Sequence, residues 1–439
     1  MYEKLRQPKL IQRIKRELGK LPDSRKGENT QYEMQDAGMG AFSVFFTQSP
    51  SFLAHQEAIK RTKGQSNAES IFSIERIPSD NQIRNILDPV SPEKLNSIYR
   101  GVVNELEKTE ILGDMRSYSN KLLIAIDGTE YFSSKKVHCE KCSQRILKNG
   151  ETNYYHTALT PVIVQAGNQH VISLEPEFIT PQDGHEKQDC EIEAGKRWIR
   201  RHGTHYGKKG TIILGDDLFS RQPFCKSLVR KKLHFILVCK PDSHEMLYKT
   251  VEFLENNQTL YTFTVRRWNG RHGEIYSYRY ANEMPLNGKR DAMLVNWCEL
   301  TITHENTAKV LYRNAFVTDF EVRETNVEAI VRDGRARWKV ENENNNVLKT
   351  KGYHLEHNFG HGDQFLASFL LSLNLLAFLS HTILNLVDVR YKMIRQALRR
   401  RRKFFGDLET LLSYIVFESW DALLDFMFNG LELNLPPPA

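Results

Sequence analysis

The chain has 439 residues, 40% of them hydrophobic and 26% charged, so it can bury a large core and form two or three domains. It carries 61 Lys and Arg against 54 Asp and Glu, and this net charge of +7 fits a nucleic-acid partner as well as many ordinary basic proteins. The six cysteines and the charged N-terminus argue against a disulfide framework and a secretory signal, so we expect a soluble protein of the reducing cytoplasm.

The first part of the chain is predicted to be helical. Residues 1–27 are polar and basic, and we expect either a solvated helix or mobile arm, or an arm that contacts DNA phosphates. A loop over residues 29–37 is expected to precede buried helical structure over residues 38–61.

A helix pair follows. Ser79 and Gln82 form a capping box that begins a helix ending at Leu87, and after a short turn a second helix extends to about Leu106. Such a pair is either scaffolding or a DNA-binding helix-turn-helix. We therefore assign residues 1–118 to a helical region for DNA binding or dimerisation.

Two short apolar runs each end in a carboxylate. Residues 122–126 precede Asp127, and residues 212–214 lead to the pair Asp216-Asp217. Runs this short and apolar are typical of buried central strands, so both acids are expected at strand ends. Asp216 directly ends its strand and is preferred, with Asp217 as the alternative.

A third carboxylate is expected on a helix. Residues 335–349 have helical composition and place Glu341 four residues after Arg337. Carboxylates from two strand ends and one helix can meet in space, and oxygen-only ligands select Mg²⁺ or Mn²⁺. Two such ions about 3.5 to 4 Å apart clamp the attacking and leaving oxygens of a displacement at phosphorus, so the predicted chemistry is metal-assisted phosphoryl transfer.

These motifs resemble the DDE transposases of bacterial insertion sequences, which share the RNase H-like catalytic fold with retroviral integrases. The resemblance covers residues 121–362, and the residues that carry it are Asp127 in IDGT, Asp216 in GDD, and the signature Arg337, Glu341 and Lys349. It implies that the two aspartates and Glu341 hold Mg²⁺ or Mn²⁺ as the catalytic set.

The resemblance also implies a reaction and partners. A transposase of this family binds the terminal inverted repeats of double-stranded DNA, hydrolyses a phosphodiester to free a 3′-OH, and joins that hydroxyl to target DNA. We expect a homodimer on DNA, in a bacterial cytoplasm and associated with the nucleoid. The alternatives are a structure-specific nuclease of the same fold, which would hydrolyse but not join, and a domesticated DNA-binding descendant, which would cut nothing.

The helical signature agrees with the family in part. Glu341 is preferred over Glu343, and the two cannot share a helix face because they lie about 200° apart. Lys349 follows Glu341 by eight positions where the common pattern has seven, and Gly334 stands where the family has a tyrosine. Arg337, Lys349 and Lys351 are candidate DNA-binding residues, and the two lysines would point at DNA phosphate.

The predicted catalytic domain, residues 119–362, has the element order of the RNase H-like fold: strand, strand, strand, helix, strand, helix, strand. After the Asp127 strand, the remaining elements are expected at residues 154–165 and 170–178 (strands that form a meander), 188–202 (helix), 210–215 (strand), 224–232 (helix) and 235–239 (strand).

Between the second aspartate and the glutamate, residues 245–325 are predicted to be a β-rich insertion. Its strands are expected at residues 261–267, 273–280, 292–302 and 310–318. One branch of the DDE transposases has such an insertion, and there it touches the cleaved transposon end. Candidate contacts are Arg266, Arg267, Trp268 and Arg271, although a hairpin turn that is simply basic explains them equally well.

Cys139 and Cys142 have the spacing of a zinc knuckle, and His156 or Cys190 could supply further ligands. Two ordinary reduced cysteines in a turn are the alternative to structural zinc. Another group of possible ligands, Glu356, His357 and His361, lies in a glycine-rich loop and is interpreted as structural or DNA-facing.

A helical C-terminal region is predicted over residues 363–439. Residues 365–387 carry no charge and are long enough to span a membrane, but their polar residues favour a core helix, so no membrane is expected. Arg395 and residues 399–403 form a basic patch, either a solvated face or a phosphate track, and residues 411–428 are expected to form one amphipathic helix. The predicted fold class is therefore α/β, with an RNase H-like mixed sheet between helical ends.

Overall fold

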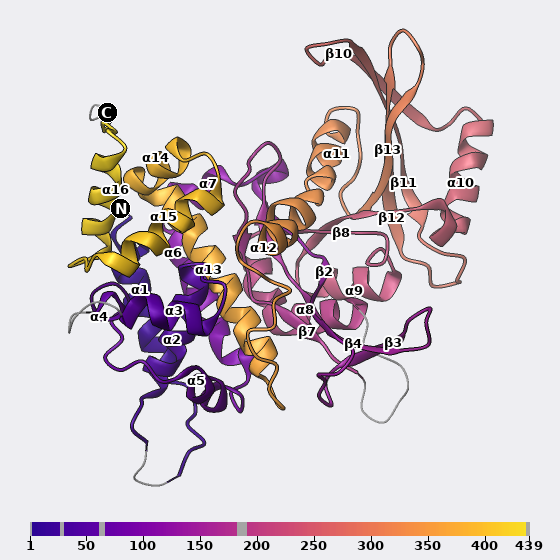
Figure 1. Ribbon diagram of the computed structural model, residues 1–439. Helices are drawn as coiled ribbons and strands as arrows, with labels where there is room; N and C mark the ends of the chain where they lie inside the picture. Colours follow the sequence, from indigo (N-terminus) through magenta and orange to yellow (C-terminus); the bar gives the residue numbers. More distant parts are fainter. Residues whose placement is uncertain (1, 27–29, 61–65, 182–190, 436–439) are drawn as a thin grey trace.

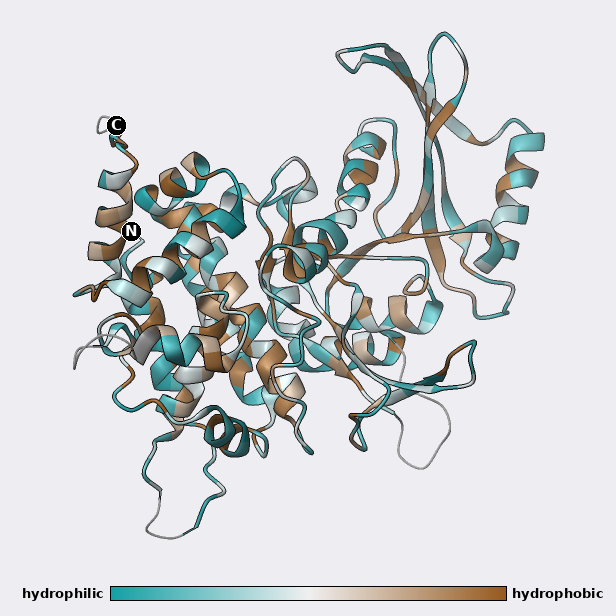
Figure 2. Cartoon of the chain, in the orientation of Figure 1, coloured by the Kyte–Doolittle hydropathy of each residue, from teal (hydrophilic) through white to brown (hydrophobic). Residues whose placement is uncertain are grey.

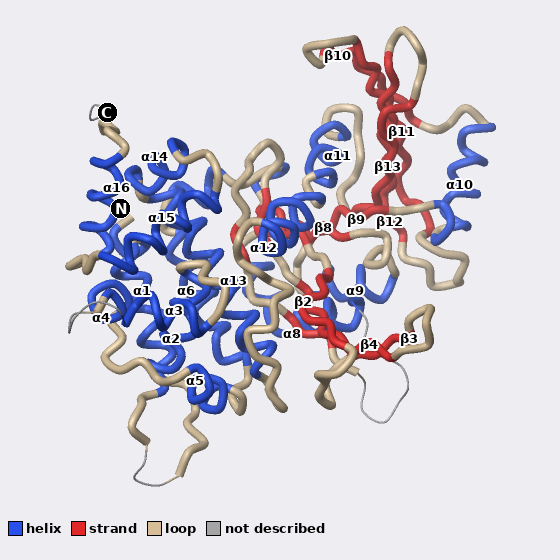
Figure 3. Tube along the Cα trace, viewed as in Figure 1, coloured by secondary structure: helices blue, strands red, loops and turns tan. Residues whose placement is uncertain are grey.

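The computed structural model describes the chain except for residues 1, 27–29, 61–65, 182–190 and 436–439. It is a mixed α/β fold, as the sequence predicted, with a mixed sheet on one side and a body of helices on the other (Figure 1). Figure 3 shows that the strands lie in one half, together with several helices, whereas the other half is helical.

The main sheet has nine strands in the order β10-β11-β12-β13-β9-β8-β1-β5-β6. Strand β1 runs parallel to β8, and β8 runs parallel to β9, whereas the other neighbours are antiparallel. Its strands in chain order are β1 Leu122–Ala125, β5 Val162–Val164, β6 Ile172–Ser173, β8 Thr211–Gly215, β9 His234–Val238, β10 Tyr261–Trp268, β11 Gly273–Pro285, β12 Leu294–His304 and β13 Val310–Thr318.

The centre of the sheet is formed by the two apolar runs that the sequence singled out. Every residue of β1 and of β8 is buried, which accounts for their continuous hydrophobic character. Their register pairs Ala125 with Leu214, and the amide of Ile126 donates to the carbonyl of Leu214 at 2.9 Å. The two strands therefore end at the same level.

Helices pack against this sheet. Helix α8 begins at Glu191, and its residues Ala194, Trp198 and Ile199 are buried, as their spacing predicted. Helix α11 packs against β9, β11 and β12. The helices of this half are α8 Glu191–Lys208, α9 Gln222–Arg230, α10 Glu245–Asn256, α11 Val327–Arg335, a π-helical segment Val340–Asn345, and α12 Asn346–Thr350.

A second, smaller sheet contains β2 Gly128–Ser134, β3 Ser143–Ile146, β4 Thr152–Leu159 and β7 Glu177–Ile179. The prediction of one meander was wrong here, because each predicted strand is divided between the two sheets. Residues 154–165 supply β4 and β5, and residues 170–178 supply β6 and β7. Pro161 and Pro176 stand at the two divisions, and proline cannot donate to a β ladder.

The four strands predicted between residues 261 and 318 are all present, although β11 and β12 extend further than expected. Strand β13 pairs with β9 in antiparallel orientation, so these strands continue the main sheet instead of forming a separate unit. They project beyond the rest of the molecule at the top right of Figure 1.

The helical body combines both ends of the chain. Helix α13 packs against α2 and α1, and α15 packs against α3 (Figure 1). The helices of this body are α1 Gln7–Leu18, α2 Met34–Phe46, α3 Phe52–Lys60, α4 Asn67–Phe72, α5 Asp80–Leu87, α6 Asn96–Glu107, α7 Glu110–Asp114, α13 Leu366–Val387, α14 Val389–Ala397, α15 Arg401–Tyr414 and α16 Trp420–Gly430, with short 3-10 turns at Glu3–Leu5, Pro92–Leu95 and Tyr118–Asn120.

The N-terminal segment is not a mobile arm. Leu10, Ile11, Ile14 and Leu18 lie on one face of α1 and are buried, a helical spacing that the basic residues between them obscured. Residues 34–37, which were predicted to be a loop, form the first turn of α2.

The predicted helix pair is present, and the capping box of Ser79 and Gln82 forms in full. Helix α6 is enclosed by its neighbours, however, and only Ser97 and Glu107 among its residues are exposed. A recognition helix needs an exposed face to enter the major groove, and α6 lacks one.

Helix α13 is a core helix. It is the one helix in the described part of the chain that is long and apolar enough to cross a membrane by length and composition, and 83% of its most apolar window is buried inside the fold. Figure 2 shows its hydrophobic residues in the middle of the molecule.

The single helix predicted over residues 411–428 is instead two helices, α15 and α16. Ser419 caps α16, and the side chain of Asn67 occupies the break between the helices. The side-chain nitrogen Nδ2 of Asn67 donates to the backbone carbonyls of Leu412 and Ile415 at 2.9 and 2.8 Å. Its side-chain oxygen Oδ1 accepts from the backbone amide of Phe417 at 2.9 Å.

Candidate active site and metal centre

Asp127 and Asp216 lie side by side at the edge of the main sheet. Because Ala125 pairs with Leu214, the same register places Asp127 opposite Asp216, each two residues beyond its paired strand position. Neighbouring strands lie about 4.8 Å apart, so the two carboxylates leave the sheet at one place.

Asp217, which follows Asp216, has a structural role. One carboxylate oxygen of Asp217 accepts from the amide of Lys240 at 2.6 Å, and the other accepts from the hydroxyl of Ser243. Asp216 makes a local turn contact, in which its Oδ1 accepts from the amide of Leu218 at 3.0 Å. Asp217 therefore fastens the end of β8 to the segment after β9, whereas the charge of Asp216 contributes to the raised pKa of Asp127.

Glu341 reaches the same region from the π-helical segment. Arg337 donates to its carboxylate at 2.7 Å, and Glu341 is half exposed. Electrostatic interactions connect Glu341 and Arg337 with Asp127, and Arg337 with Asp216. The structure thus brings the three predicted acids toward one another, with one arginine among them.

A fourth acid, Glu191, joins this group at the first residue of α8. A Cβ atom placed on Gly128 would lie 2.2 Å from a carboxylate oxygen of Glu191, so this side chain depends on the glycine that follows Asp127. Sequence reasoning missed Glu191, because nothing in its local pattern distinguishes it from any acid at a helix start. The glycine after Asp127 was the only signal, since it allows close approach.

The acids perturb one another. Burial, followed by the charges of Glu341 and Glu191, raises the pKa of Asp127 to about 7, and Arg337 opposes the shift. Burial also raises the pKa values of Asp216 and Glu191. Crowded, partly buried carboxylates of this kind are typical of cation sites and of catalytic sites.

Glu343 faces another side of its helix. It lies near Lys339 and lines a groove shared with Arg335 and Trp338, away from Asp127. The segment between Glu341 and Lys349 contains a π-helical turn, which holds one residue more than an α-helical turn. That turn takes up the one-residue excess found in the sequence signature.

Four of the seven predicted DNA-contact residues are ion-paired in the structure, among them Arg337, which pairs with Glu341. Arg266 pairs with Glu305 at 2.6 Å, and Arg267 pairs with Glu328. Lys349 pairs with Glu356 at 2.9 Å. The remaining three, Trp268, Arg271 and Lys351, are exposed, with Trp268 at 70%.

A second centre combines Cys139 and Cys142 with His156 of β4 and His361 of the loop before α13. The ligand atoms of these four residues all lie within 4.8 Å of one another, and this is the one such group in the described part of the chain that could hold a metal ion. His156 was among the predicted ligands, whereas Cys190 lies outside the described residues. His361, which was interpreted as structural or DNA-facing, belongs to this group.

The geometry of this cluster is compact. The two sulfurs are 3.9 Å apart, and Nε2 of His156 lies 3.7 and 3.4 Å from the sulfurs of Cys139 and Cys142. Nε2 of His361 lies 3.3 Å from the Cys142 sulfur and 3.2 Å from Nε2 of His156. The opposite nitrogen of His361 donates to the carbonyl of Gly362 at 2.8 Å, which turns Nε2 toward the cluster.

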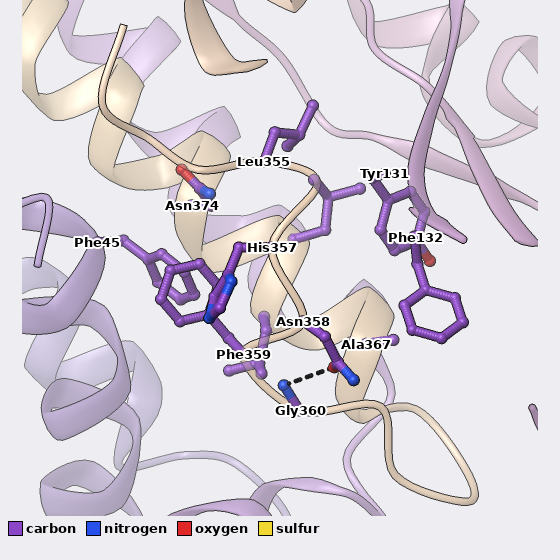
Figure 4. A pocket seen from close by; sticks show the side chains of 12 residues that line it. Phe45, Tyr131, Phe132, Leu355, His357, Asn358, Phe359, Gly360, Ala367 and Asn374 are labelled. Carbon is purple, nitrogen blue, oxygen red and sulfur yellow. Dashed lines mark hydrogen bonds between the residues drawn. The ribbon is translucent and has the colours of Figure 1, made fainter. Parts of the chain in front are cut away.

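The loop that delivers His361 is held between the two halves of the molecule. Figure 4 shows this loop passing between Phe45 of α2 and the pair Tyr131 and Phe132 of β2. The ring of Phe359 packs against Phe45 with centroids 4.9 Å apart, and Phe132 packs against His361 at 4.4 Å. The cluster therefore connects the small sheet to the helical body.

The comparisons with known proteins identify no family for this chain. No protein-family model matches this chain. No curated protein matches it either.

Proposed function

We propose that this protein is a DNA transposase of the DDE type. The observation that carries the proposal is the shared register of Asp127 and Asp216 at the ends of adjacent parallel strands, with Glu341 and Arg337 facing them from a helix. The main-sheet order of three antiparallel strands, a helix, a parallel strand, a helix and a further parallel strand supports an RNase H-like catalytic domain. Strands β10–β13 would then be the β-rich insertion.

The acids fit a hard divalent cation. Their donors are all carboxylate oxygens, which Mg²⁺ and Mn²⁺ prefer, and their mutual repulsion is the kind that a bound cation relieves. Asp127, Asp216 and Glu341 would hold the ions, with Glu191 next to them. When bound, such ions supply Lewis-acid stabilisation of the charge that develops at phosphorus.

The reaction needs no nucleophilic side chain. Water forms a bond to phosphorus while the bond to the 3′ oxygen breaks, which leaves a 3′-OH and a 5′-phosphate. That 3′-OH then attacks a phosphodiester of target DNA, one phosphodiester bond replacing another, and the proton of the hydroxyl passes to the released target 3′ oxygen. Arg337, which donates to Glu341, would bind a phosphate that enters between the acids.

We also propose that the Cys₂His₂ cluster binds structural zinc. In a tetrahedral site with Zn–S of about 2.3 Å and Zn–N of about 2.0 Å, the ligand atoms lie about 3.8 Å (S to S), about 3.5 Å (S to N) and about 3.3 Å (N to N) apart. Here the two sulfurs lie 3.9 Å apart, three of the sulfur-to-nitrogen separations are 3.3 to 3.7 Å, and the two nitrogens lie 3.2 Å apart, with all ligand atoms within 4.8 Å of one another. A zinc ion would clamp the sheet that follows Asp127 onto the helical body.

The test uses purified protein with a plasmid that carries its gene and the flanking DNA, in the presence of Mg²⁺. We expect cleavage at the ends of the element and joined strand-transfer products in a gel. Asp127→Asn and Asp216→Asn should abolish both while retaining DNA binding. Asp217→Asn is the matched control, because its partners are Lys240 and Ser243, and it should cleave with reduced thermal stability.

The outcomes separate the candidate functions. Cleaved ends without joined products would indicate a nuclease. Binding without any cleavage by the wild-type protein would indicate a non-catalytic DNA-binding protein. Activity in Asp127→Asn or Asp216→Asn would refute the assignment of the acids.

A further inference from the structure

A basic cleft of about 890 Å³ lies between the helix that carries Glu341 and the C-terminal helices. Its walls come from the π-helical segment, α12, α13, α14 and the start of α15. One carboxylate, that of Glu343, lines it, together with seven cationic side chains: Lys351, Lys392, Arg395, Arg399, Arg400, Arg401 and Arg402.

These cations differ from the other basic residues considered above. Arg266, Arg267, Arg337 and Lys349 each pair with a carboxylate. Among the described residues, none of the seven cleft cations forms an ion pair. Like charges gathered in this way repel one another, so the cleft carries an electrostatic cost that a bound anion would offset.

Two buried polar groups in the cleft wall also lack a protein partner. The hydroxyl of Tyr391 and the Nη1 atom of Arg395 make no hydrogen bond in the described structure, and Tyr391 is only 1% exposed. Because both atoms are shielded from solvent, a bound phosphate would act on them through its charge and not through a direct hydrogen bond. Burial lowers the pKa of Arg395, and the nearby charge of Arg401 lowers it further.

The start of α15 adds to the positive potential. This helix begins at Arg401 without a side-chain cap and has no acid in its first turn. Its free backbone N–H groups carry partial positive charge, which favours phosphate oxygens at this end. Arginines on the same turn present planar donors suited to phosphate.

We propose that this cleft binds the phosphodiester backbone of double-stranded DNA. A polymer of phosphates matches a row of cations along several helices better than a single small anion does, because it offers one charge for about every 1.7 Å of duplex. Glu343, Val347 and Thr350 in the cleft wall belong to the helical segment that carries Glu341, so DNA held here lies against the same segment as the acids, on its other face. The inference rests on the proposed function only for the identity of the DNA as substrate.

The experiment measures fluorescence anisotropy of a labelled 20-base-pair duplex of arbitrary sequence with the full-length protein, over a range of KCl concentrations. The cleft variant combines Arg399→Gln, Arg400→Gln and Arg402→Gln, three exposed residues whose replacement should not disturb the fold. The matched control removes the same charge from exposed positions elsewhere, as Lys148→Gln, Lys208→Gln and Arg230→Gln.

We expect the cleft variant to bind about 10- to 100-fold more weakly near physiological salt, with the slope of log K against log[salt] reduced by about 2 to 3. The control should change both by much less. Equal losses in the two variants would overturn the proposal, and so would displacement of the duplex by micromolar pyrophosphate, which would indicate a small-anion site.

The binding measurement is independent of cleavage. If Asp127→Asn and the wild-type protein both bind the duplex through the cleft but neither cuts DNA, the proposed function fails and the cleft assignment survives. If the wild-type protein cuts DNA and the cleft variant binds and cuts like the control, the cleft assignment fails and the proposed function survives.

Discussion

Replacing Asp127 by asparagine is expected to stabilise the protein in the absence of divalent cations, and to do so more strongly as the pH rises. The pKa of this carboxyl is raised from its ordinary value of 3.8 to about 7, by burial and by the charges of Glu341 and Glu191. Below both values the group is protonated in the folded and unfolded chain alike. Between them, only the unfolded chain loses the proton, so stability falls as pH rises, and above about 7 the loss is complete.

The size of the effect follows from the part of the pKa shift of Asp127 that lies within the tested pH range. Between about pH 5 and about pH 8.5 the wild-type protein loses the equivalent of about 2 pKa units, or about 2.7 kcal/mol. Unfolding entropy of about 2.1 cal/mol/K per residue gives about 0.9 kcal/mol/K for 439 residues, which converts this energy to about 3 °C in melting temperature. Asparagine does not titrate, so Asp127→Asn does not lose this stability as the pH rises.

The assay is thermal unfolding of both proteins in EDTA at the two pH values. The melting temperature of Asp127→Asn relative to wild type should rise by about 3 °C from the lower to the higher pH. Asp114→Asn, at an exposed position, serves as the control and should show no such trend. Mg²⁺ at high pH should raise the melting temperature of the wild-type protein alone. A difference between Asp127→Asn and wild type that stays constant with pH would refute the account of the crowded acids.

Three further predictions concern other parts of the molecule. Glu341→Gln should cleave DNA about 100-fold more slowly than wild type or worse, because a cation ligand is lost, whereas Glu343→Gln should stay within about threefold of the wild-type rate. The reverse ranking in a gel cleavage assay would show that Glu343, and not Glu341, faces the aspartates. Cys142→Ser should lose bound zinc, as measured by elemental analysis, and should melt at a lower temperature than wild type. The control Cys298→Ser, also buried but outside the cluster, should keep one zinc per chain. Equal zinc content in both variants would exclude the site. Asn67→Ala should destabilise the helical body by about 3 to 6 kcal/mol, because three backbone groups, two buried and one partly buried, lose their partners. A melting temperature within about 1 °C of wild type would contradict this.

The parts of the site that sequence could predict are those with a local pattern. The continuous apolar runs before Asp127 and Asp216 identify buried strands, and the strand ends follow from them. Asp216 was preferred over Asp217 because it directly follows its apolar strand, and the contacts of Asp217 with Lys240 and Ser243 give that second aspartate a separate structural role. The one-residue excess before Lys349 depends on a π-helical turn, which no periodicity analysis of an α-helix anticipates.

Other features depend on residues that are distant in sequence. His361 joins His156 across 205 positions, and a glycine-rich loop gives no indication of its partner. The acid at the start of α8 is likewise recognisable only once β1 and α8 are adjacent. In contrast, the divisions at Pro161 and Pro176 and the apolar face of α1 have a local signal that the predictions missed, because proline interrupts a β ladder and the spacing of apolar residues marks a buried helix face.

The joining of both chain ends in one helical body has a consequence for biosynthesis. Asn67 binds the amide of Phe417, which is 350 residues later in the chain, and α2 packs on α13. At about 5 to 20 residues per second, a ribosome needs about 20 to 70 s to produce the partners of the first helices. During that time the apolar faces of α1 and α2 lack their final cover and are candidates for chaperone binding. A message cut short before α13 would yield a protein whose N-terminal helices have no core to complete.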